Sequence, residues 1–376
     1  MNHRDRVLKA LQHEEPDLVP IYSLGFEPTC TTYQQFMKSN EFKVNATNIP
    51  GVGDITEQRF WHADLWAMHP WKEFTTEYYP VPKGYEGYSL HFTGRVYRQE
   101  TTGSRSGVPF RWYHTGLFTS PEIVHEYWDR HGKPVDLIDD SQDYSPQVWN
   151  SYVEALSPYV YPMAWLTLSI HEGLFEGMTL SKLAYYIKKQ PEFVHEIADA
   201  FLDANLELIK RFGEAGVEVV FYSDDFAQHG RSILSRKDFE TFILPRYKQL
   251  YDACKKQNML VVQHSCGFVD EFLPLVVDAG LDAIQSLEPA AGVDLAGLKE
   301  NYGDRIAFLG GMDSTRVLCF GTPEDVVNDV RRCISAAGHS GGYFAGPAHT
   351  ILDAPWENII AFRDAIEKCR KYPLFS

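Results

Sequence analysis

Two residues with metal-binding side chains lie two positions apart in the stretch MLVVQHSCG: His264 and Cys266. In an extended segment, residues i and i+2 point to the same side, so this imidazole and thiolate can share one ion. Nitrogen and sulfur donors in a tetrahedral array suit zinc. The same spacing is also compatible with two packing residues, and two ligands do not make a tight site.

A third ligand must come from another part of the chain. We expect it to be His349, because the segment GGYFAGPAH places this residue at an equivalent height after a different strand. Asp225, Glu288 and His229 are the alternatives. A zinc ion with three protein ligands keeps one open position, as catalytic zinc sites require.

Other titratable residues follow the predicted strands at similar positions. Asp225 follows VEVVFYS, Glu288 follows LDAIQSL, and His171 and Glu172 follow YPMAWLTLSI. We expect Asp225 or Glu288 to orient a ligand histidine or to take a proton. Tyr222, His171 and Glu172 are expected to shape the substrate pocket. A single residue of this kind is more often a helix cap or a structural hydrogen-bonding group, so the inference depends on several strand ends carrying one.

The elements that would position these residues alternate between strand and helix. Strands are expected at eight places in the sequence: 18–25, within 61–70, 161–170, 217–223, 259–265, 281–287, 305–311 and 341–347. Helical patterns separate the last five, which predicts a parallel sheet with right-handed crossovers. About eight strands favour an α/β fold of the (β/α)8 TIM-barrel type over an open sheet. Functional residues of such a barrel lie where the strands end.

Residues 75–118 interrupt this alternation. The stretch YSLHFTGRVYRQETTGSRSGVPFRWYHTG alternates in polarity and is broken by glycines, which predicts antiparallel hairpins. We interpret it as an insertion in the N-terminal third of a single barrel domain spanning 1–376.

Composition excludes several classes of protein. Thirty-five Lys and Arg residues against 51 Asp and Glu residues give a net charge of −16, which disfavours nucleic acid as a partner. No run of 18 apolar residues exists and the N-terminus has no apolar core, so we expect neither a membrane span nor a signal peptide. The six cysteines are scattered without a CxxC pair, as is typical of reduced thiols in a cytoplasmic protein.

Several blocks of the chain resemble the uroporphyrinogen decarboxylase-like superfamily, over essentially its whole length. They include RDRVLKALQHEEPDLVPIY, SDDFA, FILPRYKQL, HSCGFVDEFLPLVVDAGLDAIQSLEP and RIAFLGGMD. The fold of that superfamily is a (β/α)8 barrel, which agrees with the strand pattern. The resemblance is closest to its zinc- and corrinoid-dependent methyltransferase branch, whose HxCG block matches residues 264–267. That branch has a further cysteine after the last strand, where this chain has His349 in GPAHTI.

The resemblance implies a zinc-dependent methyltransferase that moves a methyl group between a small substrate and a corrinoid, a cobalamin carried by a partner protein. An ion held by one thiolate and two imidazoles keeps a net positive charge, which makes it a better Lewis acid than an ion held by two thiolates and an imidazole. We therefore expect O-demethylation, with a methoxylated aromatic as the methyl donor. A homodimer is compatible with this kind of barrel.

Two other functions remain open. The resemblance also includes cofactor-free decarboxylases of uroporphyrinogen, which carry an Arg-rich segment near the N-terminus for the propionates. The matching stretch here, PIYSLGFEPTCTTYQQF, has no arginine. The third hypothesis is a non-catalytic barrel that binds a small molecule or a corrinoid, with His264 and Cys266 as packing residues.

Overall fold

A curved sheet of seven parallel strands runs through the protein in the order β15-β14-β13-β12-β9-β8-β3. The computed structural model describes residues 1–71, 78–101, 104 and 107–374. The strands of this sheet are β3 (Leu65–Met68), β8 (Tyr161–Leu166), β9 (Val219–Ser223), β12 (Leu260–Ser265), β13 (Ala283–Ser286), β14 (Ala307–Gly310) and β15 (Tyr343–Phe344). All of them lie within the strand segments predicted from the sequence.

Residues 20–22 join the two edges of this sheet. The N–H of Tyr22 donates to the carbonyl of Ala345, directly after β15, at 3.1 Å. On the opposite side, the N–H of Leu65 in β3 donates to the carbonyl of Ile21 at 3.1 Å. Both bridges are parallel. The segment therefore takes the place of an eighth strand between β15 and β3. The strands together form the ring of a TIM-like α/β fold.

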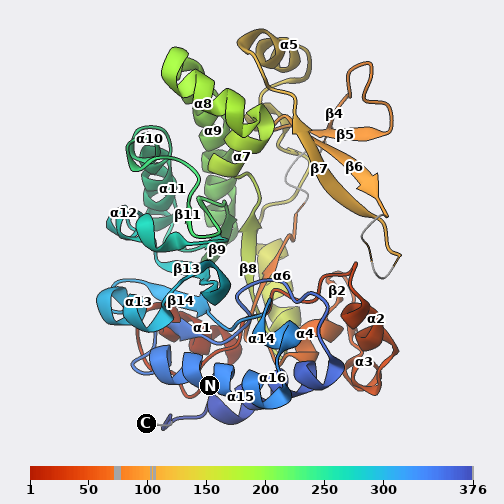
Figure 1. The fold of residues 1–376 in the computed structure, drawn as a ribbon, viewed down its shortest axis with the longest axis vertical. Coiled ribbons are helices and arrows are strands. Elements are labelled where there is room, and N and C mark those ends of the chain that lie inside the picture. Colours follow the sequence, from red (N-terminus) through yellow and green to blue (C-terminus); the bar gives the residue numbers. More distant parts are fainter. Residues whose placement is uncertain (72–77, 102–103, 105–106, 375–376) are drawn as a thin grey trace.

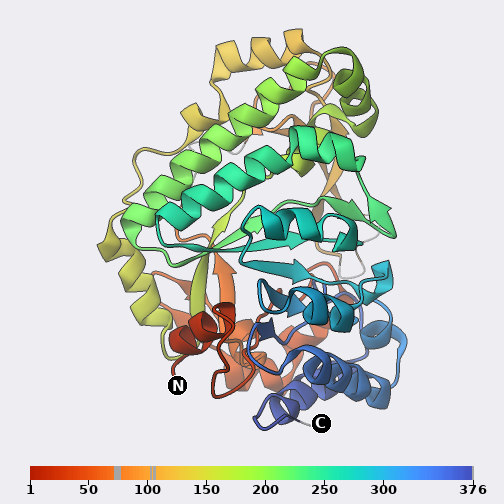
Figure 2. The ribbon, with the colours of Figure 1, turned by 90° about the vertical axis from the view of Figure 1, so that its left-hand side faces the viewer.

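Helices cover the outside of the ring and connect successive strands (Figures 1 and 2). Those that follow the strands are α7 (His171–Met178), α8 (Leu180–Lys189), α9 (Pro191–Ala215), α10 (Arg236–Phe242), α11 (Leu244–Lys256), α12 (Leu273–Asp278), α13 (Leu295–Tyr302), α14 (Val317–Phe320), α15 (Pro323–Ala337) and α16 (Trp356–Cys369). The N-terminal half contributes α1 (His3–Leu11), α2 (Thr31–Lys38), α3 (Asn40–Asn45), α4 (Thr56–Phe60), α5 (Pro121–His131) and α6 (Pro146–Leu156). Within the described ranges, none of these helices is both long and apolar enough to cross a bilayer.

The longest helix, α9, shows how the sequence sets such elements. Pro191 lies in its first turn, where the missing N–H has no intrahelical partner to lose. Gly216 ends the helix in the left-handed conformation, with φ of 86°, which glycine adopts without steric cost. Its buried residues include Ile197, Phe201 and Leu208, whose spacings of four and seven positions place them on one helix face against the sheet.

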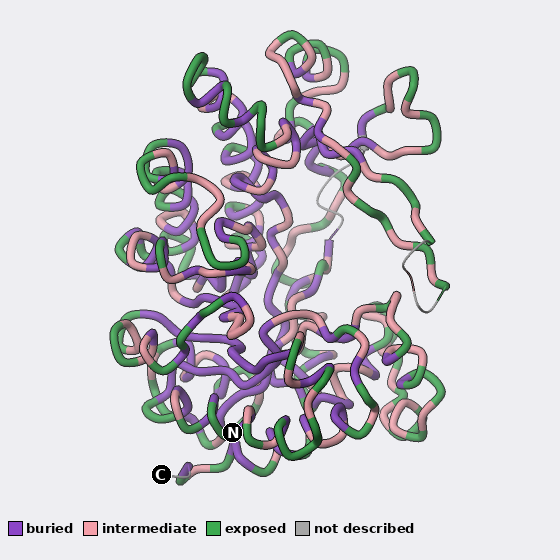
Figure 3. Tube along the Cα trace, in the orientation of Figure 1, coloured by how far each residue is buried: buried purple, intermediate pink, exposed green. Residues whose placement is uncertain are grey.

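The barrel strands are mostly buried (Figure 3). Their residues alternate between two cores. Met163, Phe221 and Val262 belong to the core inside the ring. Val220 and Tyr222 belong to the larger core between the ring and the helices. Side chains alternate along a strand, so the odd- or even-numbered position of a residue, here called its parity, decides which core it faces. The same parity decides which residues after each strand reach the barrel mouth.

A separate antiparallel sheet lies beside the mouth, in the order β4-β5-β6-β7 (Figure 1). Its strands are β4 (Tyr78–Tyr79), β5 (Tyr88–His91), β6 (Arg95–Glu100) and β7 (Phe110–Gly116). Within the predicted hairpin segment, residues 75–77, 102–103 and 105–106 lie outside the described residues. Two short hairpins complete the strands: β1 (Asn48–Ile49) with β2 (Gly53–Asp54), and β10 (Ala227–Gln228) with β11 (Arg231–Ser232).

The antiparallel sheet contacts the barrel through α7. The N–H of Phe118 donates to the carbonyl of Gly177 at 2.9 Å. A Cβ at Gly177 would lie 2.0 Å from the carbonyl oxygen of Thr93, so the two backbones approach more closely than any other residue would allow. This contact brings Arg95 of β6 next to the first turns of α7.

Candidate metal centre

His264 and Cys266 meet at the carboxyl end of β12. The Nε2 atom of His264 lies 3.1 Å from the Sγ atom of Cys266. The His264 side chain is 14% exposed, and both residues have the parity of the inner core. The sequence-based expectation that this pair shares one side of the strand therefore matches the geometry.

Asp225, two residues beyond β9, completes a group of three possible metal donors with this pair. Its Oδ1 atom lies 3.6 Å from His264 Nε2 and accepts the backbone N–H of Cys266 at 2.7 Å. One possible ligand atom from each of the three residues lies within 4.8 Å of the others. The carboxylate thus fixes the loop that carries the cysteine as well as facing its side chain.

His349, the expected third ligand, belongs to a second group, which it forms with Cys266 and Glu288. The three predicted ligands do not come together in one group, because His264 is absent from the second and His349 from the first. The backbone N–H of His349 donates to Ser314 Oγ at 3.1 Å, so the loop after β15 is held towards β14. His229, a predicted alternative, lies exposed in the turn between β10 and β11 and belongs to neither group.

A chain of hydrogen bonds from the opposite side of the barrel sets the tautomer of His264. The hydroxyl of Tyr22 donates to the carbonyl of Pro347, which can only accept. The amide nitrogen of Gln285 then donates to the Tyr22 oxygen at 3.0 Å. The Gln285 oxygen consequently accepts the Nδ1–H of His264. Nε2 is left with its lone pair directed at Cys266 and Asp225, as a metal-ligating imidazole requires.

The chemistry of the group fits a zinc ion. Tetrahedral Zn–N, Zn–O and Zn–S bonds of about 2.0 to 2.3 Å place neighbouring donors about 3.3 to 3.6 Å apart, close to the distances measured here. Burial raises the pKa of the Cys266 thiol, and the negative charges of Asp225 and Glu288 raise it further. A thiolate at this position therefore needs a cation beside it, and a zinc ion held by these residues would supply one.

Tyr222, predicted to shape the substrate pocket, lies instead on the helix side of the sheet. It is fully buried, and its hydroxyl donates to Asp224 at 2.8 Å. The same carboxylate accepts the hydroxyl of Tyr247 and the backbone N–H groups of residues 170–172, at the start of α7. Asp224 thus positions the β8–α7 loop. The sequence pattern that points to Asp225 does not separate it from Asp224, although Asp224 shares its even-numbered position in the strand alternation with Tyr222.

His171 and Glu172, also predicted to shape the pocket, occupy the first turn of α7. His171 is fully buried, and its Nδ1 donates to the carbonyl of Asp225 at 2.7 Å. Burial lowers the pKa of His171 to about 4, so the imidazole is neutral near pH 7. Its hydrogen bond holds the backbone of Asp225, and His171 belongs to neither of the two donor groups.

Arg95 forms ion pairs with both Glu172 and Glu176. Arg95 lies 3.5 Å from Glu172 and 3.1 Å from Glu176. Burial raises the pKa of Glu176 to about 7, while Arg95 opposes the increase and Glu172 adds to it. Burial also raises the pKa of Glu172, with the same opposition from Arg95 and with Asp225 adding to the increase. The antiparallel sheet therefore contributes a charge next to the metal centre, and the hairpin pattern in the sequence did not reveal it.

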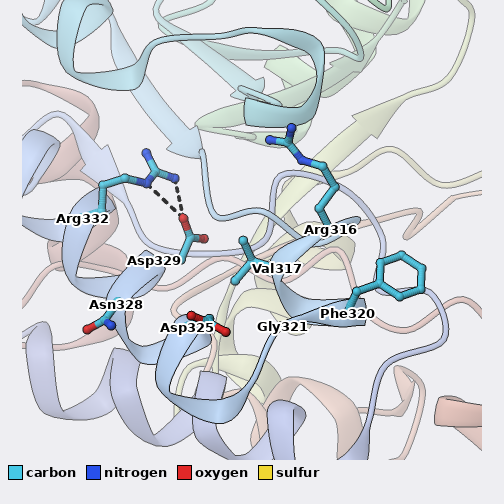
Figure 4. A pocket seen from close by; sticks show the side chains of 8 residues that line it. All are labelled: Arg316, Val317, Phe320, Gly321, Asp325, Asn328, Asp329 and Arg332. Carbon is cyan, nitrogen blue, oxygen red and sulfur yellow. Dashed lines mark hydrogen bonds and ion pairs between the residues drawn. The ribbon is translucent and has the colours of Figure 1, made fainter.

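A separate surface hollow lies at α14 and α15 (Figure 4). Its arginines are already paired, Arg332 with Asp329 and Arg316 with Asp313. None of the predicted site residues lines it; its lining residues are Arg316, Val317, Phe320, Gly321, Asp325, Asn328, Asp329 and Arg332.

Comparison with known proteins gives a family and a mixed set of relatives. Residues 171–369, more than half of the chain, match the family described as "Uroporphyrinogen decarboxylase (URO-D)". The chain is 26% identical over 199 residues to a methylated-thiol–coenzyme M methyltransferase from Methanosarcina mazei, a match that covers 52% of this chain and 49% of that protein. It is 25% identical over 216 residues to a uroporphyrinogen decarboxylase from Psychromonas ingrahamii, covering 55% and 56% of the two chains.

The chain spans about half the length of these curated relatives. Among solved structures, a methyltransferase from Methanosarcina mazei matches 98% of this chain and 99% of its own, with a TM-score of 0.59 and 15% identity. That likeness shows a shared fold. Taken with the family match over the second half of the barrel, where the strand ends carry His264, Cys266 and Asp225, the comparisons place this chain in the uroporphyrinogen decarboxylase (URO-D) family.

Proposed function

We propose that this protein is a zinc-dependent methyltransferase that moves a methyl group between a small substrate and a corrinoid carried by a partner protein. The observation that carries the proposal is the donor group of Asp225, His264 and Cys266, with the Nε2 lone pair of His264 directed into it. Zinc bound there would act as a Lewis acid on the heteroatom that carries the methyl group. Two of the similar proteins, one by sequence and one by structure, are named methyltransferases.

The ligand set that best fits the distances contains Asp225 in place of His349. With a neutral imidazole, a thiolate and a carboxylate, the bound dication has no net charge, whereas the set with His349 would leave one positive charge. A carboxylate oxygen donates less electron density than a thiolate, so the ion keeps more Lewis acidity than in a site with two thiolates. This favours polarisation of an ether oxygen, and hence O-demethylation of a methoxylated donor. Glu288 and His349 are proposed to face the open position.

Zinc content tests the proposal directly. We expect about one zinc per wild-type chain and less than about a tenth of that in Cys266→Ser, because two of three ligands cannot hold a catalytic zinc tightly. Cys30→Ser is the matched control, since Cys30 lies outside both donor groups. Stoichiometric zinc in Cys266→Ser, measured by atomic absorption after dialysis, would contradict the site.

Two further variants decide the third ligand. Asp225→Asn removes the carboxylate charge and His349→Ala removes the competing imidazole. The measured distances predict that Asp225→Asn weakens zinc retention more. A greater loss of zinc in His349→Ala would indicate that His349 is the third ligand. It would not contradict the methyltransferase function.

The second candidate function is a metal-free decarboxylase, which is favoured by the relatives named uroporphyrinogen decarboxylase. Among the residues described at the barrel mouth, Arg95 is already shared by two carboxylates. A substrate with many carboxylates would be repelled by Asp225, Glu172 and Glu288. Release of carbon dioxide from uroporphyrinogen III by zinc-free protein would establish this function and reject the methyltransferase.

A further inference from the structure

A row of aromatic rings near the carboxyl ends of the strands leads from His69, which is exposed after β3, to the candidate metal centre. The ring of His69, directly after β3, stacks on Trp165 of β8 with centroids 4.8 Å apart and an interplanar angle of 19°. Trp165 meets Phe221 of β9 edge to face at 5.4 Å. Phe221 lies 6.2 Å from the ring of His264. Trp165 and Phe221 both have the inward parity, and they are register partners on neighbouring strands.

The indole of Trp165 carries an unused hydrogen-bond donor. Its Nε1 atom is shielded from solvent and has no acceptor among the described residues. Burial of a tryptophan normally comes with a partner for the N–H, because an unpaired buried donor is destabilising. Such donors are informative when they lie beside a reactive centre, since a ligand oxygen can supply the missing acceptor.

We infer that His69, Trp165 and Phe221 form an aryl subsite for the methyl donor, in which the aromatic ring packs against these side chains and an oxygen at its far end accepts Trp165 Nε1–H. This inference rests on the proposed function and specifies its substrate as a methoxylated phenol. The metal end of the donor would lie at His264, and the phenolic end would lie at Trp165. Phe221 lies between Trp165 and His264, and its side chain would contact the aromatic ring of the bound donor.

The charges around the site favour a neutral ligand over a carboxylate. Asp225, Glu172 and Glu288 surround the mouth, and Arg95 is committed to two of the neighbouring acids. A phenol brings an oxygen acceptor without a negative charge, whereas an aromatic acid would add one to this cluster. Ring faces and edges supply attraction that needs no charge at all.

The test pairs two ligands with one substitution. In zinc-loaded protein, 4-methoxyphenol can accept the indole N–H through its hydroxyl, and methoxybenzene has no second oxygen. Trp165→Phe keeps an aromatic ring and removes the N–H. We expect this variant to bind 4-methoxyphenol about three- to ten-fold more weakly, the range of one neutral hydrogen bond, and to bind methoxybenzene almost as well as wild type does. Isothermal titration calorimetry gives both dissociation constants without requiring turnover.

The controls separate local from general effects. Trp112→Phe, at an exposed position of β7, should change neither affinity. His69→Ala, at an exposed position, should weaken both ligands equally, because it removes the ring stacked on Trp165 and no hydrogen bond to the ligand. This variant also keeps the inference testable if Trp165→Phe folds poorly.

Each outcome has a defined consequence. An equal loss for the two ligands in Trp165→Phe would overturn the role of the N–H. If zinc-loaded wild type binds neither ligand but transfers the methyl group of dimethyl sulfide to a corrinoid protein, the aryl subsite is wrong and the methyltransferase stands. If the purified protein holds no zinc, the proposed function fails, and titration of the metal-free protein with methoxybenzene still shows whether the aromatic row binds a ring.

Discussion

A single amide controls which nitrogen of His264 is available to an ion. Gln285 is tied to Tyr22 through its N–H group, so its oxygen can only face the imidazole Nδ1–H. The imidazole would therefore need no tautomer exchange and no ring rotation to bind the proposed metal ion. Groups that hold a ligand histidine in this way commonly change metal affinity strongly when they are removed.

Replacing Gln285 by leucine should weaken zinc binding by about 10- to 100-fold, because Nδ1 loses its acceptor and the ring is free to turn. A chelator competition titration measures this change. Gln263→Leu is the matched control: Gln263 lies on β12 with the opposite parity, and its side chain bonds Tyr251 among the outer helices. Equal zinc affinities of the two variants would show that the amide does not control His264.

Among the elements, α7 connects the barrel to the antiparallel sheet. Its first turn is held by Asp224, and its last turn meets Thr93 at Gly177. Between these two contacts, Glu172 and Glu176 receive Arg95 from β6. The helix therefore fixes the position of Arg95 relative to the candidate metal centre.

Gly177→Ala should separate these elements, because its Cβ would meet the Thr93 carbonyl at 2.0 Å. Overpacking against backbone costs about 1 to 3 kcal/mol. We expect faster amide exchange in β6 and β7 by hydrogen-exchange mass spectrometry, with β9 and β12 unchanged. Gly173→Ala should have a smaller effect, since its methyl would meet the movable ring of Phe201. Uniform destabilisation of all strands would contradict this localisation.

Prediction from the sequence succeeded where the signal was local. Apolar runs of four to eight residues between helical patterns gave the parallel strands, and the i, i+2 spacing gave the pair His264 and Cys266. The same alternation, applied to β9, would have assigned Phe221 to the barrel interior and Tyr222 to the helix side. Spacing alone does not choose between His349 and the predicted alternative Asp225, because their positions relative to the pair depend on loop contacts, such as the bond from His349 to Ser314.

At the scale of the whole molecule, a buried ion cluster joins both ends of the chain to the ring. Asp64 is fully buried at the start of β3 and accepts from Arg6 of α1 at 2.6 Å and from the N–H of Ile21 at 2.9 Å. Arg370, directly after α16, lies 3.2 Å away. Asp64 lies at the amino-terminal end of β3, whereas the candidate metal centre lies at the carboxyl ends of the strands, so the expected role of the cluster is structural.

Asp64→Asn should lower the free energy of unfolding by about 3 kcal/mol, because the buried guanidinium groups of Arg6 and Arg370 lose the fully buried one of their carboxylate partners. Burial alone would raise the pKa of Asp64, but the His3 hydrogen bond and the charges of Arg370 and Arg6 outweigh it and lower the pKa. A lowered folded-state pKa means that the carboxylate stabilises the protein above about pH 4 and loses this effect as the pH falls further.

Urea denaturation at several pH values checks both statements. The difference between wild type and Asp64→Asn should be largest near pH 7 and should shrink in acid. Asp17→Asn, which removes the exposed partner of Arg6, should cost less than about 1 kcal/mol. A difference that does not vary with pH would argue against ionised Asp64 as the source of the stability.

The segment at residues 20–22 has two tasks that depend on each other. It completes the ring between β15 and β3, and its Tyr22 hydroxyl spans from Pro347 to Gln285. During synthesis, residues 20–22 can pair with the segment at β15 only after that segment has been made, more than 300 residues later. Until both have docked, the Gln285 amide that faces His264 lacks its Tyr22 partner, so tight uptake of the proposed zinc would report that the chain has finished folding.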